Sequence, residues 1–312
     1  MRRPIGPSGK RLLLLLCILL GLAGVAQGDA KEPNTPLESL GPEPEEEEDL
    51  SSIYLRNTSV ILPPGTWDLE VEMDYRRGKS GPLDDSDLSR QFRMPMTARF
   101  GICRGWEGSV SVPLIYSYRE LWDGTNVNSD EDIGFGDVTA GASFQVGEEK
   151  PSWPEMVGTV QVRAPTGRDP YRGTGDEADL GSGHWGVSSS LQFVRTTDPL
   201  VLFWGIGYIH QFSERSHGQK YEPGEGVMYN MGLGFSVNDD VSLSGRFAGV
   251  YQGDWKIGGH KVEGTSYEPM SLRLAATLRY RRRVYLEPAV SFGLNDDAPD
   301  VAAGIALITR LP

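Results

Sequence analysis

Cysteine is nearly absent from this sequence. Its 312 residues include two cysteines, Cys17 and Cys103, and Cys17 lies in an apolar segment that we expect to be removed on export. Only Cys103 then remains in the mature chain, and a single thiol forms no internal disulfide. The fold therefore draws its stability from another source, which excludes a small secreted domain held together by disulfides.

Long apolar runs are missing after the first 28 residues. A membrane-spanning helix needs about 20 consecutive apolar residues, and no later segment approaches that length. If the protein is embedded in a membrane, it must therefore cross as strands.

The first 28 residues have the three parts of a secretory signal. Basic residues precede the apolar run 12–22, and the small residues of Ala26-Gln27-Gly28 follow it. This order predicts a signal peptide over residues 1–28, cleaved after Gly28. A single helical anchor is the alternative, but it would need a longer apolar run with basic residues after it, and here an acidic stretch follows.

Positive charge is scarce once the signal is removed. The mature chain keeps 26 Lys and Arg residues against 43 Asp and Glu residues, a net charge of −17. Such a surface repels nucleic acid, which we do not expect as a partner. Residues 29–52 are rich in Pro and Glu and predict a disordered acidic periplasmic leader. Residues 53–312 are expected to form one folded domain.

Residues 67–77, WDLEVEMDYRR, alternate strictly between large apolar residues and carboxylates. Successive side chains of a strand point to opposite faces, so this segment predicts a strand with an apolar face and an acidic face. In a soluble sandwich the apolar face packs on a core and the acids face water. In a membrane barrel the apolar face contacts lipid and the acids face a wet lumen.

The remaining strands and their connections favour the barrel. Alternating apolar segments predict about twelve antiparallel strands and no helix. Tight joins near 103–104, 195–199, 238–240 and 281–283, with a somewhat longer one at 147–154, are interleaved with long ones at 77–89, 119–134, 165–183, 213–225 and 253–266. Only the last connection, 295–300, is short for its side. Short periplasmic turns alternating with long extracellular loops are typical of outer-membrane barrels.

Aromatic spacing gives an independent check. Trp106 and Tyr116 share a face ten residues apart, which is about 33 Å of strand. A tilt of roughly 40° projects this to about 25 Å, the height of the apolar band between aromatic girdles. We therefore predict an all-β fold, an antiparallel transmembrane β-barrel of about twelve strands.

Charged residues on the inward parity of these strands are candidate lumen residues. Opposite charges on neighbouring strands either fix the register or create a transverse field that guides a polar solute, and both interpretations stay open. Inward glycines at 141, 205, 207, 232, 234 and 304 are expected to leave room inside. The candidates are Asp68, Glu70, Glu72, Asp74, Arg93, Arg99, Arg163, Arg246, Arg273 and Arg279.

The segment PTGRDPYRGTGDEADLGSG is Gly-rich, but no helix is predicted after it. A phosphate-binding loop precedes a helix, so this segment is not interpreted as one. It is predicted to be a long external loop that either stays solvated or folds into the barrel as a charged constriction. The charged residues of that constriction are Arg168, Arg172, Asp176, Glu177 and Asp179.

Acidic residues gather in other loops. Loose, exchangeable divalent cations could bridge them to each other or to lipopolysaccharide, although their spacing matches no dedicated calcium loop. No zinc or haem ligand spacing occurs, so we expect no cofactor and no resident metal. The acidic groups are Asp84, Asp85 and Asp87; Asp130, Glu131 and Asp132; and Asp296, Asp297 and Asp300.

Several motifs in this order resemble the outer-membrane β-barrel porin and transporter family linked to the meta-pathway of phenol degradation. They are TSVILPPGTWDLEVEMDY, GFGDVTAGASFQV, APTGRDPYRGTG with LGSGHWGVSSSLQF, and TDPLVLFWGIGYIHQF, and the resemblance covers roughly residues 58–312. It implies a barrel that passes small, often hydrophobic or aromatic, compounds. One departure is the C-terminus, Thr309-Arg310-Leu311-Pro312, where outer-membrane strands commonly end in an aromatic residue that the assembly machinery reads.

The sequence thus predicts an outer-membrane channel for passive uptake of small solutes. One alternative is a non-conducting structural or surface-interaction barrel. A lipid-modifying enzyme is the other, and it would need a serine activated by a histidine. Ser182 beside His184, and Ser213 beside His210, are the pairs that sequence proximity offers. No recognisable signature surrounds either pair, so we do not expect an enzyme.

Overall fold

The computed structural model describes residues 61–80, 86–122, 127–168, 180–216 and 218–312. The chain divides into the units Met1–Glu47 and Glu48–Pro312, and every described residue belongs to the second. The predicted signal peptide (1–28) and leader (29–52) lie outside the described residues and stay predictions. No helix in this described part is long and apolar enough to cross a membrane.

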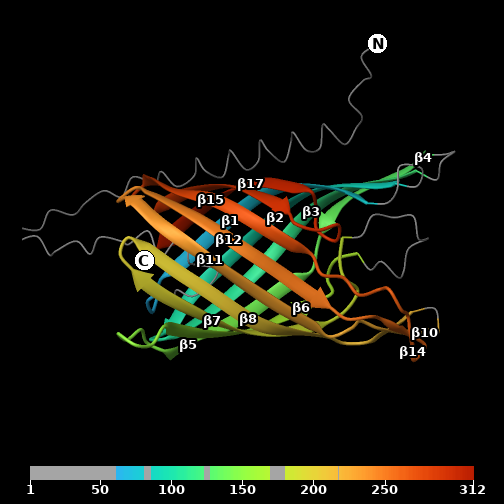
Figure 1. Ribbon diagram of the computed structural model, residues 1–312, viewed down its shortest axis with the longest axis horizontal. Helices are drawn as coiled ribbons and strands as arrows, with labels where there is room; N and C mark the ends of the chain where they lie inside the picture. Colours follow the sequence, from blue (N-terminus) through green and yellow to red (C-terminus); the bar gives the residue numbers. More distant parts are fainter. Residues whose placement is uncertain (1–60, 81–85, 123–126, 169–179, 217) are drawn as a thin grey trace, which may run out of the picture. The chain divides into compact units, whose positions relative to one another are not determined.

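Twelve antiparallel strands form a closed barrel (Figure 1). Strand β1 pairs with β2 on one side and with the last strand, β17, on the other, which closes the ring. This confirms the predicted fold class. The barrel strands are β1 (Trp67–Ser80), β2 (Ser86–Cys103), β3 (Trp106–Trp122), β5 (Val138–Gly147), β6 (Glu155–Ala164), β7 (Gly186–Thr197), β8 (Leu200–Gln211), β11 (Gly226–Asn238), β12 (Val241–Gln252), β15 (Met270–Arg281), β16 (Val284–Gly293) and β17 (Val301–Leu311).

Strand β8 shows how the outer face differs from the interior. Leu202, Trp204 and Ile206 are 44%, 38% and 57% exposed, whereas Val201 and Phe203, on the opposite parity, are each 5% exposed. In a soluble protein the large apolar residues would be the covered ones. Here they form an outward apolar band, which is the face that a barrel presents to lipid.

Two connections predicted as loops are largely strand. The segment 77–89 is shortened because β1 continues to Ser80 and β2 begins at Ser86. Within 119–134, β3 continues to Trp122 and a further strand, β4 (Val127–Phe135), pairs along it. Backbone hydrogen bonding continues here without the apolar periodicity of the barrel strands, so the sequence pattern gave no strand signal.

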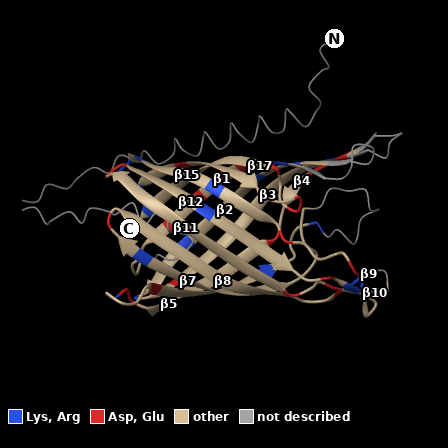
Figure 2. Ribbon diagram, in the orientation of Figure 1, with Lys and Arg blue, Asp and Glu red and all other residues tan. Residues whose placement is uncertain are grey.

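The predicted loops 213–225 and 253–266 also contain strands. Strands β9 (Glu214–Ser216), β10 (Gln219–Glu222), β13 (Lys256–Ile257) and β14 (His260–Lys261) form a second, four-stranded sheet. Lys and Arg residues gather around β9 and β10 (Figure 2). Strands of two to four residues are too short to show a period, which is why the sequence did not predict them.

Residue Asp254 holds the base of β13 and β14 together. Its carboxylate accepts hydrogen bonds from Thr265 N at 3.1 Å and Ser266 N at 2.9 Å, and it lies 2.9 Å from Lys261 Nζ. The Lys261 ammonium, followed by the backbone N–H of Ser266, lowers the pKa of Asp254. The carboxylate therefore stays ionised and keeps these contacts at neutral pH.

Gly141, Gly205, Gly207, Gly232 and Gly304 do not leave open space, contrary to the expectation. A Cβ added to Gly205 would lie 2.2 Å from the Gln192 side chain, and one added to Gly232 would lie 2.3 Å from the Phe203 ring. These glycines instead let side chains of neighbouring strands lie flat against the wall.

Candidate functional site

The carboxylates of β1 lie inside the barrel. Asp68, Glu70 and Asp74 are at most 7% exposed, whereas Trp67 and Tyr75 on the other parity are 42% and 43% exposed. The register places Asp68 opposite Arg99 and Asp74 opposite Arg93 on β2. The alternation in the sequence therefore becomes a row of interior acids with arginines beside it.

Four residues from four strands form what we call the basal cluster: Asp68, Arg99, Glu107 and Arg310. Arg99 donates through Nε and Nη2 to both Glu107 carboxylate oxygens, at 2.7 and 2.8 Å, and its Nη1 lies 3.7 Å from Asp68. Arg310 donates through Nε and Nη2 to the same Asp68 carboxylate, at 2.8 and 3.0 Å. Buried charges of this kind persist only when each is paired, as here.

A second group, the central cluster, joins Glu72, Arg273 and Glu287. Arg273 donates to Glu72 at 3.0 Å and to Glu287 at 3.4 Å, and the Thr277 hydroxyl donates to Glu287 at 3.1 Å. The sequence prediction included Glu72 and Arg273 but missed Glu287. It also missed Glu107 and Arg310 in the basal cluster, although all three residues occupy the inward parity of their strands.

Two interior arginines, Arg246 and Arg93, share one feature. The Nε atoms of both are buried and have no hydrogen-bond partner within the described ranges. Arg246 lies directly opposite Arg273 in the register of β12 and β15, so two like charges face each other across the strands. Directly opposed like charges destabilise a sheet unless something else compensates them.

The last two predicted lumen residues lie at the rims of the barrel rather than in its middle. Arg163 contacts Asp137 at 3.9 Å and donates to Gln211 at 2.9 Å, close to the outer ends of their strands. Arg279 lies 3.9 Å from Asp240, in the turn between β11 and β12. These contacts tie strand ends together.

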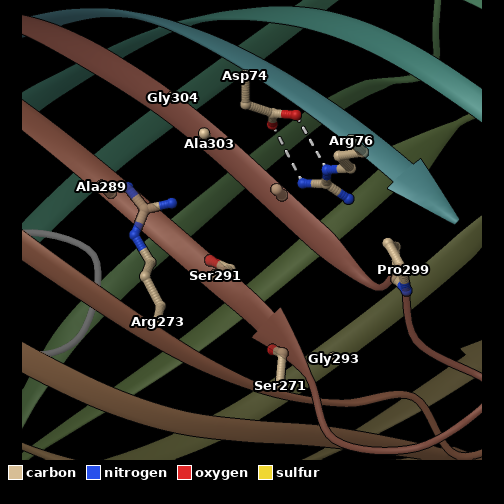
Figure 3. Close-up of a pocket in the computed structure, with 11 residues that line it drawn as sticks. Asp74, Arg76, Ser271, Arg273, Ala289, Ser291, Gly293, Pro299, Ala303 and Gly304 are labelled. Carbon is tan, nitrogen blue, oxygen red and sulfur yellow. Dashed lines mark hydrogen bonds and ion pairs between the residues drawn. The ribbon is translucent and has the colours of Figure 1, made fainter.

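A pocket of about 130 Å³ lies in the barrel wall where β1, β17, β16 and β15 run side by side. Figure 3 shows the Asp74–Arg76 pair on one side of it, Arg273 on the other and small residues between them. Arg76 donates to both carboxylate oxygens of Asp74, at 3.0 and 3.2 Å. The lining residues are Asp74, Arg76, Ser271, Arg273, Ala289, Ser291, Gly293, Pro299, Ala302, Ala303 and Gly304.

The predicted constriction loop is only partly described. Arg168 forms an ion pair with Asp132 of β4. The other members of the prediction, Arg172, Asp176, Glu177 and Asp179, lie outside the described residues, so closure of the pore by this loop stays a prediction.

Asp137 fastens the base of the same loop. Its carboxylate accepts hydrogen bonds from Gly167 N at 3.0 Å, Ser182 N at 2.8 Å and Ser182 Oγ at 2.6 Å. Gly167 and Gly181 approach so closely that a Cβ on Gly167 would lie 2.7 Å from the Gly181 Cα. Asp137 belongs to the motif GFGDVTAGASFQV and Gly167 to APTGRDPYRGTG, so parts of these two motifs hold the base of the loop together.

Replacing Asp137 with alanine is expected to loosen this loop base. A hydrogen bond to a charged group contributes about 1.5–3 kcal/mol, so losing three should raise trypsin cleavage after Arg168 more than tenfold. Limited proteolysis of the folded protein in detergent measures the rate. Asp240→Ala, which removes an exposed carboxylate from a turn, serves as the control. Equal cleavage rates for Asp137→Ala and the native protein would contradict this role.

The two histidines considered as catalytic bases have other contacts. His184 is 1% exposed, its Nδ1 lies 3.0 Å from the Phe212 carbonyl oxygen, and the Ser182 hydroxyl contacts the backbone O and N of His184. His210 Nδ1 lies 3.0 Å from Glu225, to which the Tyr208 hydroxyl donates at 2.5 Å. A serine nucleophile needs its hydroxyl on the imidazole, and the contacts described for these two rings are with Phe212 and Glu225.

The described part of the chain contains no group of three or more His, Cys, Asp or Glu residues able to hold a metal ion. Asp84 and Asp85 lie outside it. Others are engaged in the protein, since Asp297 accepts a hydrogen bond from Glu268 N at 2.8 Å and Glu131 accepts one from Tyr116 at 2.8 Å. Loose cation binding at these loops stays a prediction.

The chain belongs to the family described as "Putative MetA-pathway of phenol degradation", whose model matches residues 88–311. This confirms the resemblance drawn from the motifs. An outer membrane channel from Pseudomonas putida F1 is similar in structure, with a TM-score of 0.65 and 13% identity over 87% of this chain and 100% of that chain. The translocator domain of the autotransporter NalP from Neisseria meningitidis has a TM-score of 0.50 and 9% identity, over 84% of this chain and 95% of that domain. Both likenesses support the barrel fold.

Proposed function

We propose that this protein is an outer-membrane channel for the passive uptake of small solutes. The observation that carries the proposal is a closed barrel with an apolar outer face and a charged interior that holds a pocket. If side chains simply filled the interior, apolar residues would serve as well, because each ionised group inside must be paired or solvated. Export by the predicted signal peptide and residence in the outer membrane belong to the same proposal.

The solute class has two indications. The description of the family points to phenolic, and hence aromatic, compounds. The interior itself favours polar solutes, because the inward residues of β1 are acids and those of β2, β12 and β15 include arginines. A small compound with a polar or ionised group satisfies both indications.

A non-conducting barrel is favoured by one observation. Leu62, just before β1, is 1% exposed, and its N–H donates to the interior carboxylate of Glu107 at 3.0 Å. Tyr285 and Ile308 on the inward parity of β16 and β17 are 0% exposed. Side chains therefore fill part of the interior near the periplasmic turns.

Single-channel recording of the refolded mature protein in a planar bilayer separates the two. Discrete current steps in symmetrical salt are expected for a channel, because ions can pass between the interior charges. A folded control is available in the heat-dependent gel shift of the same sample. Absence of any conductance from protein shown to be folded would overturn the channel and favour the structural barrel.

A further inference from the structure

One row of paired residues crosses the inner wall of the barrel from β15 to β1. Arg273 lies opposite Ser291 on β16, and Ser291 lies opposite Ala302 on β17. Ala302 in turn lies opposite Arg76 on β1. The two arginines are therefore three strand spacings apart, about 14 Å, and the two side chains between them are small.

The next row along the strands repeats this pattern. Ala289 on β16 lies opposite Gly304 on β17, and Gly304 lies opposite Asp74 on β1. Arg273 faces the lumen, since Leu274 beside it on β15 is 45% exposed on the outer face. Long polar side chains on both sides of a floor of small ones leave the pocket of about 130 Å³ that Figure 3 shows.

The charges around this pocket balance one another. On one side, Asp74 accepts hydrogen bonds from Arg76 through both carboxylate oxygens. On the other, Glu72 and Glu287 both accept from Arg273, and their second negative charge offsets the arginine that lies opposite it on β12. An ion that entered alone would have to displace one of these partners, whereas a neutral molecule would not.

Hydrogen-bonding groups remain for such a neutral molecule. A guanidinium has five N–H donors, and Arg76 and Arg273 each use two of theirs in contacts with the described part of the chain. The hydroxyl groups of Ser271 and Ser291 line the same pocket and can both donate and accept. The pocket therefore offers donors and acceptors to one small molecule from both of its sides.

From this arrangement we propose that the pocket binds a small, neutral solute with several hydroxyl groups on its way through the barrel. The solute oxygens accept from the guanidinium groups of Arg76 and Arg273, and its hydroxyl groups donate to Ser271 and Ser291. The pocket is slightly smaller than the cavity of about 150 Å³ that holds one benzene ring, so it suits a chain of about four carbon atoms. This inference names a solute class for the proposed channel and rests on that function.

Saturation-transfer NMR on the full mature protein, in a detergent without sugar head groups, measures the binding. Erythritol, a four-carbon chain with a hydroxyl group on every carbon, is the probe, and butane-1,4-diol, which lacks the two inner hydroxyl groups, is its matched analogue. The diol is expected to bind at least tenfold more weakly, because two hydrogen bonds are lost. Glycine and sodium glycerate are also expected to bind at least tenfold more weakly, because a charged group would compete with the paired charges of the wall.

Two variants locate the site. Ser291→Ala should weaken erythritol binding about fivefold, since it removes one hydroxyl group from the middle of the pocket. Ala289→Leu should weaken it more than tenfold, because the larger side chain fills the floor. Ser190→Ala is the matched control and should leave binding unchanged, since Ser190 lies on β7, separated from β16 around the ring by β15, β12, β11 and β8. The heat-dependent gel shift shows that each variant is folded.

Three results would each overturn the inference. One is equal binding of erythritol and butane-1,4-diol, and another is binding of glycine or glycerate as tight as that of erythritol. The third is unchanged erythritol binding in folded Ser291→Ala or Ala289→Leu.

The site and the channel fail separately. Conductance without erythritol binding would leave the channel and remove the site. Erythritol binding by a protein that never conducts would keep the site and remove the channel. A reversible reduction of the single-channel current by erythritol, weaker in Ala289→Leu, is the result expected when both hold.

Discussion

Replacing Asp68 with leucine is expected to lower the free energy of unfolding by about 3–5 kcal/mol. Asp68 is 1% exposed and accepts two hydrogen bonds from Arg310, while Arg99 lies 3.7 Å away. Leucine fills a similar volume but leaves the Arg310 guanidinium buried without its carboxylate. The cost arises from that uncompensated charge, and it should be larger than the worth of the intact pair.

Urea unfolding in detergent micelles, followed by tryptophan fluorescence, measures this change. Asp240→Leu is the matched control, because Asp240 is 70% exposed and lies 3.9 Å from Arg279 in a turn. An exposed pair contributes at most about 1 kcal/mol, so the control should remain near the native value. Similar losses in the two variants would show that the basal cluster is not what stabilises the closed barrel.

Replacing Ile206 with arginine is expected to lower the free energy of unfolding by about 2–4 kcal/mol when the protein is folded in a bilayer. Ile206 is 57% exposed, on the outer face near the middle of β8. At that depth an arginine side chain must leave water and enter the hydrocarbon region. This penalty exists only if the outer face contacts lipid.

The control comes from the same strand and the same face. Leu200 is 41% exposed at the first residue of β8, beside the turn, where an arginine head group can reach water. Leu200→Arg should therefore cost about 0–1 kcal/mol. Unfolding of both variants in lipid vesicles gives the comparison. Equal costs at the two depths would contradict the placement of the apolar band in the membrane.

Asp68→Leu and Ile206→Arg test the inward and the outward face of the barrel strands. Asp68 lies on the inward parity of β1, and Ile206 lies on the outward parity of β8. If the basal cluster closes the barrel and the outer face is embedded in lipid, both substitutions destabilise it, for opposite reasons. One leaves a charge inside without its partner, and the other introduces a charge where lipid is expected.

The sequence by itself determined the strands of the barrel and which side chains point inward. Alternation along a strand is local, so WDLEVEMDYRR was enough to place Asp68 and Asp74 on one face. Loop spacing and aromatic spacing then distinguished a barrel from a sandwich. Strand extensions beyond the apolar band, such as β4, were missed because pairing without a lipid face has no apolar period.

Only the tertiary structure decided which charges meet. Arg310 and Asp68 are 242 positions apart, and Arg273 and Glu72 are 201 positions apart. These pairs depend on the closure of the ring and on the register of every strand between them. The alternation within a single strand specifies neither the closure nor the register. The inward glycines show the same limit, because the side chain that covers each one comes from a neighbouring strand. Parity is a local property of the chain, whereas the partners inside the lumen are a property of the closed barrel.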